Sequence, residues 1–107
     1  MTTFDKREKA FEDKHAHDLE LQFKVTARRN KLLGVWAAQK LGMNDADAQL
    51  FSDEVVLSDF QQAGDDDVLA KIHDAFINGG ISIDEDTIRT HMQNLLIDAK
   101  EQLFKEV

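Results

Sequence analysis

Two histidines near the N-terminus, with a glutamate close by, form the pattern in this sequence that could most readily bind a metal. Glu12 precedes His15 by three residues, and His17 follows two residues later. Glutamate and histidine at this spacing are ligands in carboxylate-bridged di-iron sites of helical bundles, which also require a second such motif and two more glutamates. His73 and His91 have no glutamate three residues earlier. We therefore predict exposed histidines, whose protonation changes the local charge near neutral pH, and no metal site.

No other group of residues completes a catalytic or ion-binding pattern. The acidic run at residues 65–67 lacks the ligand spacing of a calcium loop, so it is expected to begin a helix. Asn-Gly-Gly at residues 78–80 is not followed by the Gly-Lys-Ser/Thr of a phosphate loop, so it is expected to end one. The chain has no cysteine, and its three serines lack a visible base. The sequence predicts a protein that is not an enzyme and has no cofactor.

The histidines lie in what we predict to be the first part of one long helix. Thr2 and Asp5 have the spacing of a capping box, which places the helix start at Thr2 or Thr3. Residues 3–41 contain no proline, and Gly42 is the expected C-terminal stop. From residue 19 onwards, apolar residues recur mostly every three or four positions, which predicts a buried face. These residues are Leu19, Phe23, Ala27, Leu33, Trp36, Ala37 and Leu41.

Three further helices are predicted after residue 42. Asn44 or Asp45 caps the second, the acidic run begins the third, and Asp84 caps the fourth. The run at residues 55–57 is β-branched, but a lone strand is not stable, so we assign it to the second helix. Short connections between amphipathic helices favour an antiparallel bundle, and the predicted fold class is an all-α four-helix bundle. The expected apolar positions are Ala46, Leu50, Phe51, Val55, Val56, Leu57 and Phe60, then Val68, Leu69, Ile72 and Phe76, then Ile83, Ile88, Met92, Leu95, Ala99 and Leu103.

The first helix is too long for the bundle to cover. A helix of 39 residues spans roughly 58 Å, whereas one of 23 residues, the expected length of the fourth, spans roughly 34 Å. About the first fifteen residues must therefore overhang, and an isolated helix of that length is marginal in water. We expect residues 1–17 to be a mobile segment that is disordered when free, and residues 18–107 to form the bundle domain.

Phe4 and Phe11 stand seven residues apart in this overhang, on one helical face among charged residues. One interpretation is that both pack into the bundle. The overhang favours the other, in which they anchor a helix that docks in a groove of a partner protein. Burial of two phenylalanines contributes roughly 3–6 kcal/mol. A micromolar complex needs about 8 kcal/mol, so charged contacts or more of the helix must contribute as well.

The distribution of charge indicates a protein partner. Residues 1–33 contain eight Lys/Arg and six Asp/Glu (+2), and residues 34–107 contain five and fifteen (−10), which gives the net −8. An acidic body disfavours nucleic acid, and no apolar run approaches the ~20 residues of a membrane span. Lys24, Arg28 and Lys31 share one face with Arg29 beside them, and we expect a solvated face that balances the acidic body, with pairs to the later helices as one possibility. The absence of cysteine and of a secretory leader indicates a cytoplasmic protein.

Four stretches resemble the zeta subunit of alphaproteobacterial F-type ATP synthase. They are FDKREKAFEDKHAHDLE, ARRNKLLGVWAAQKLG, VLSDF and DEDTIRTHMQNL, in the same order over essentially the whole chain. The resemblance implies a four-helix protein that inhibits ATP hydrolysis and associates with the membrane only peripherally, through the synthase. Its N-terminal segment would insert as a helix between catalytic subunits near the rotor stalk, with the alpha, beta and gamma subunits as partners.

Carried onto this sequence, the resemblance implies an inhibitory segment from Thr2 to His17. Its implied contact residues are Thr2, Thr3, Phe4, Asp5, Arg7, Glu8, Lys9, Ala10, Phe11, Lys14 and His17. His17 stands in the Ala-His-Asp step of that family, whereas His15 replaces an aromatic residue, commonly phenylalanine. The alternative function is a helical adaptor that binds another protein through the same segment.

Overall fold

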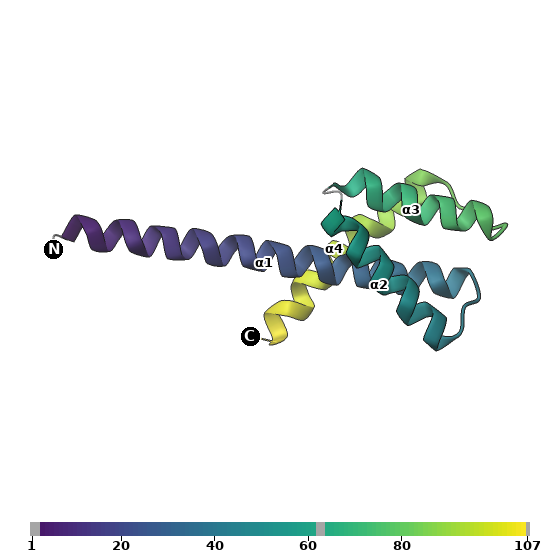
Figure 1. Cartoon of the computed structure of the whole chain (residues 1–107), viewed down its shortest axis with the longest axis horizontal. Coiled ribbons are helices and arrows are strands. Elements are labelled where there is room, and N and C mark those ends of the chain that lie inside the picture. The colour runs from purple at the N-terminus through teal and green to yellow at the C-terminus, as the bar shows by residue number, and fades with distance from the viewer. Residues whose placement is uncertain (1–2, 62–63, 107) are drawn as a thin grey trace.

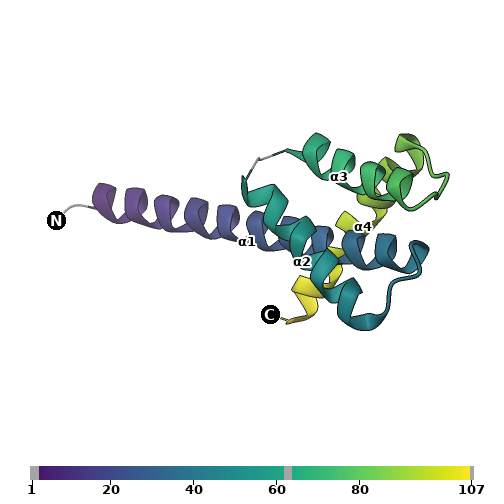
Figure 2. The same cartoon turned by 45° about the vertical axis from the view of Figure 1, so that its right-hand side comes forward.

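Four helices make up the computed structural model of this chain, which describes the backbone of residues 3–61 and 64–106 and the side chains of residues 17–59 and 64–106. They are α1 (Thr3–Lys40), α2 (Asp45–Gln61), α3 (Asp65–Asn78) and α4 (Glu85–Glu106). The other three helices gather around the C-terminal half of α1, and its first part projects beyond them in both views (Figures 1 and 2). The overall dimensions are 64 × 25 × 21 Å. The predicted all-α four-helix fold and the long first helix are confirmed.

The helix ends form where the sequence predicts them. Gly42 and Gly80 both have φ +72°, and each closes a Schellman motif, with the next residue donating to the carbonyl five positions back. At the other ends, Asn44 Oδ1 accepts from Asp47 N, and Asp84 Oδ1 accepts from Thr87 N, both at 2.8 Å. These contacts pair backbone groups that a helix end leaves unsatisfied, so each stop and start is fixed locally.

The main core lies where all four helices meet. It is built from the fully buried Leu33 and Ala37 of α1, Val55 of α2, Val68, Ile72 and Phe76 of α3, and Ile88 of α4, with Leu69 and Met92 almost as deeply buried. Trp36 packs edge-on against Phe76 and stacks on His91 at 4.0 Å between ring centroids. A smaller cluster of Val25, Ala99 and Leu103 joins α1 to α4 nearer the projecting part. The predicted faces of α3 and α4 are confirmed.

Gly34 lets α1 and α2 approach at backbone distance. A Cβ placed at this position would lie 2.6 Å from Ser52 Cα and 2.9 Å from Ser52 Cβ. Ser52 is fully buried, and its hydroxyl donates to the Gln49 carbonyl of its own helix at 2.9 Å. Two small residues therefore set the distance between these helices.

The predicted buried faces of α1 and α2 are wrong in part. Leu19 and Phe23 are 52% and 53% exposed, and the side chains that α1 buries there are Val25, Arg29 and Asn30. On α2, Leu50 and Leu57 are exposed, and Ala46 is exposed as well, whereas the polar Ser52 is buried. On α1, Arg29 and Asn30 are buried with polar partners on the neighbouring helices, and on α2 the small Ser52 is buried against Gly34.

Candidate functional site

The predicted contact residues all fall at the start of the chain, on or just before α1. Thr2 lies outside the described residues. The next nine belong to the projecting part of α1, where the backbone is helical and the side chains lie outside the described part. They are Thr3, Phe4, Asp5, Arg7, Glu8, Lys9, Ala10, Phe11 and Lys14. His17 is described and exposed.

The backbone of α1 runs without a break through the boundary between residues 17 and 18. Seven residues advance a helix by nearly two turns, so Phe4 and Phe11 share a face of this rod, as predicted from their spacing. The use of these residues as anchors stays a prediction. The expectation that residues 1–17 are disordered when free also stays a prediction.

A groove of about 760 Å³ opens at the base of the projecting part, beginning at His17. We call it the basal groove. Its apolar lining comes from three helices, through Leu21, Phe23 and Ala27 of α1, Val56 of α2, and Leu103 and Phe104 of α4. Phe104 is 67% exposed. The sequence did not predict this groove, because its lining combines residues that were assigned to the core with Leu21 and Phe104, which were assigned to no face.

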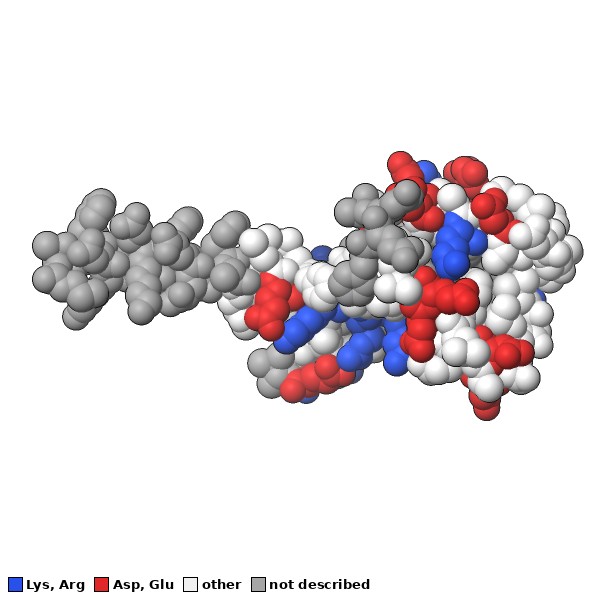
Figure 3. Space-filling model, in the orientation of Figure 1, with Lys and Arg blue, Asp and Glu red and all other residues white. Residues whose placement is uncertain are grey.

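Two basic side chains on the rim of the basal groove pair with rim carboxylates. Arg28 binds α4, with Nη2 2.8 Å from Glu106 Oε1 and Nη1 donating to Gln102 Oε1 at 2.9 Å. Lys24 pairs with Glu20 of its own helix at 3.2 Å. Figure 3 shows the result on one face, where a group of basic side chains beneath α1 is bordered by acidic ones. The predicted balance of the basic cluster against the acidic body is therefore confirmed for Arg28, and this surface is not a basic patch.

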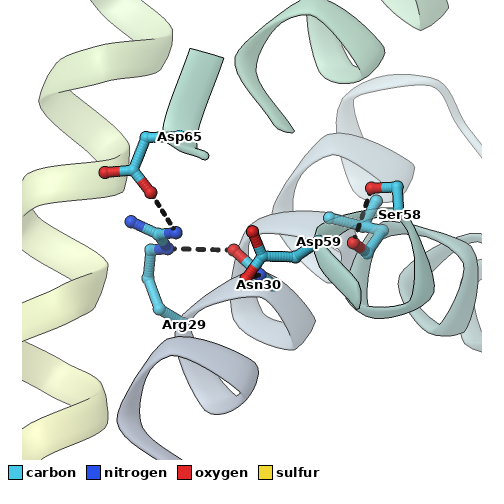
Figure 4. A network of polar contacts seen from close by, with 6 residues as sticks. Arg29, Asn30, Ser58, Asp59 and Asp65 are labelled. Atoms are coloured by element: carbon cyan, nitrogen blue, oxygen red, sulfur yellow. Dashed lines mark hydrogen bonds and ion pairs between the residues drawn. The ribbon is translucent and has the colours of Figure 1, made fainter. Parts of the chain in front are cut away.

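Arg29 departs from the prediction of a solvated face, because only 3% of it is exposed. Its Nη2 donates to Asp65 Oδ1 at 2.8 Å, and its Nε donates to Asn30 Oδ1 at 3.0 Å (Figure 4). Asn30 is fully buried, and its Nδ2 donates to Asp59 Oδ2 at 3.1 Å. This network joins α1 to the end of α2 and the start of α3. It fixes α1 just beyond the groove, and no described buried side-chain polar atom is left without a partner.

The histidines do not assemble into a metal centre among the side chains that the structure describes. His91 stacks on Trp36, and His73 Nδ1 lies 3.7 Å from Glu85 Oε1. The Glu12 and His15 side chains lie outside the described part. Hydrogen bonds from the Thr87 side chain and backbone, helped by His73, hold the pKa of Asp84 below its usual value of 3.8. Asp84 thus acts as a helix cap.

Within the described ranges, no helix is both long and apolar enough to cross a bilayer.

The chain is similar to known proteins in both sequence and fold. A family model described as ATPase inhibitor subunit zeta matches residues 1–102. A protein with a solved solution NMR structure is 38% identical, with a TM-score of 0.71, and the alignment covers 81% of this chain and 99% of that chain. A comparison with curated proteins gave no match.

Proposed function

We propose, from the premise that this chain belongs to the ATPase inhibitor subunit zeta family, that it restrains ATP hydrolysis by ATP synthase through its N-terminal segment. Membership of that family implies a non-catalytic protein that inhibits hydrolysis and binds the synthase. The finer proposal is that residues 1–17 insert as a helix between catalytic subunits near the rotor stalk. The alpha, beta and gamma subunits would then be its partners, at the cytoplasmic side of the membrane.

The projection of α1 is the observation that carries this proposal. Residues 3–16 extend from the bundle as helical backbone, so a partner can surround them on every side (Figure 1). The bundle is fixed to the same helix by its core and by the buried Arg29 network. Insertion of the projecting part would therefore leave the bundle outside the catalytic interface. The bundle would stay attached to the inserted helix through its core and the buried Arg29 network.

The mechanism follows from the need of each catalytic interface to open and close during hydrolysis. A helix held between two subunits keeps their facing surfaces apart, and the interface cannot complete its cycle. If residues 1–17 order on binding, they cost a few kcal/mol of the gross interaction energy. The affinity would then respond to small changes in the segment, including the charge on His15 and His17.

Hydrolysis by the purified synthase, measured against inhibitor concentration, tests the proposal. Full-length protein should inhibit, and a version that lacks residues 1–17 should not. The double variant Phe4→Ala, Phe11→Ala should weaken inhibition well beyond tenfold, since it removes roughly 3–6 kcal/mol of apolar burial. Ile77→Ala is a matched control, because it removes an apolar side chain that is 59% exposed at the far end of α3.

Two results would contradict the proposal. If full-length protein leaves hydrolysis unchanged, the chain does not inhibit, and the helical adaptor becomes the better hypothesis. If the truncated version inhibits as strongly as the full chain, inhibition does not depend on residues 1–17.

A further inference from the structure

We propose that the basal groove is a second contact surface for the same catalytic subunits, and that it receives an apolar ridge of the subunit surface beside the inserted segment. The inference rests on the proposed function and extends it, because the binding site would then run past residue 17 onto the bundle.

Exposed apolar side chains are concentrated at and beside the basal groove. Leu19, Phe23 and Phe104 are each more than half exposed, at 52%, 53% and 67%. Two smaller grooves of about 400 and 370 Å³ adjoin the basal groove and share residues of α1 with it, and Leu19 lines one of them while Phe104 lines the other. Contiguous exposed apolar surface of this kind marks interaction sites in soluble proteins.

The basal groove lies directly next to the projecting part of α1. From His17 to Phe23 the helix rises by only about 9 Å, and from His17 to Leu19 by about 3 Å. Because α1 is continuous here, any protein that encloses residues 3–17 ends within two helical turns of the groove. Continuity with the proposed insertion site thus identifies the occupant as the subunit that holds the segment.

The rim of the basal groove carries equal numbers of basic and acidic side chains. The rim carries three basic residues, Lys24, Arg28 and Lys31, and three acidic ones, Glu20, Asp53 and Glu106, so its Lys/Arg and Asp/Glu charges are equal in number. Two of the basic residues are already paired with two of the acidic ones. A balanced rim around an apolar floor favours an apolar ridge of a folded subunit over a strongly acidic or basic peptide.

The test uses full-length protein with Phe23→Ser or Phe104→Ser, two residues that line the basal groove, and Ile77→Ser as the matched exposed control. Circular dichroism should show unchanged helix content, because all three side chains are more than half exposed. We expect the concentration for half-maximal inhibition to rise about tenfold or more for the two groove variants and to stay within twofold for the control. If wild type inhibits and the groove variants inhibit equally well, the inference fails while the proposed function stands. If wild type does not inhibit, the proposed function fails first.

A second measurement does not depend on a loss of affinity. The photoreactive residue p-benzoylphenylalanine in place of Phe104 should crosslink to a catalytic subunit, and in place of Ile77 it should not. Crosslinks only between two copies of this chain, with a dimer in solution at inhibiting concentrations, would assign the groove to self-association and overturn the inference. Inhibition without any crosslink from position 104 would also overturn it.

Discussion

Replacement of Gly34 by alanine tests the central contact of the bundle, because the sign of its effect depends on the structure. In a helix that faces solvent, alanine is more stable than glycine by about 1 kcal/mol. Here the added Cβ would lie 2.6 Å from a backbone atom of Ser52, a distance that real Cβ atoms essentially never show. Since a backbone atom cannot rotate away, α1 and α2 must move apart.

The expected magnitude is a balance of these two effects. Overpacking of a well-filled contact costs about 1–3 kcal/mol. The contact is with backbone, so the upper half of that range applies, and the helix-propensity gain of about 1 kcal/mol leaves a net loss of about 1–2 kcal/mol. For a domain of this size, that lowers the melting temperature by roughly 5–10 °C.

Urea and thermal unfolding, followed by circular dichroism and by Trp36 fluorescence, measure this loss. Gly42→Ala is the matched comparison, because Gly42 has φ +72° with nothing within 4 Å of an added Cβ. Its cost comes from backbone strain alone, of about 1–2 kcal/mol, and should change little from alanine to serine. At Gly34 the cost should grow from alanine to serine to valine. A higher melting temperature for Gly34→Ala would refute the close crossing.

Two further predictions concern stability. Arg29→Ala should destabilise the fold by about 1–3 kcal/mol in urea unfolding, because it leaves the buried Asn30 Oδ1 without its donor; an unchanged midpoint would show that the network is dispensable. The lowered pKa of Asp84 means that its cap contributes stability above pH 3.8, and that this contribution is lost as the pH falls through the folded-state pKa. Asp84→Asn should remove that part of the pH dependence, and a carboxyl titration by NMR should give a midpoint below 3.8; a midpoint at or above this value would contradict the prediction.

The sequence predicts well whatever is fixed by local rules. Both Schellman stops, the caps at Asn44 and Asp84 and the amphipathic faces of α3 and α4 depend on residues close together in the chain, and all are confirmed. The burial of Arg29 and Asn30 depends on Asp65 and Asp59, which are 36 and 29 residues away respectively, so the periodicity of α1 does not predict it. The basal groove has the same origin, since three separate helices form it.

The pairing of α1 with α4 also bears on how the protein is made. Arg28 contacts Gln102 and Glu106, residues 74 and 78 positions later, so α1 packs on a helix that is synthesised well after it. Contacts this distant in sequence can form only after α4 has emerged from the ribosome. Until then, Val25 lacks its packing contacts with Ala99 and Leu103 of α4. We expect the projecting part of α1 to emerge from the ribosome before α4, so that a chain arrested before α4 would present it without the contacts that α4 adds.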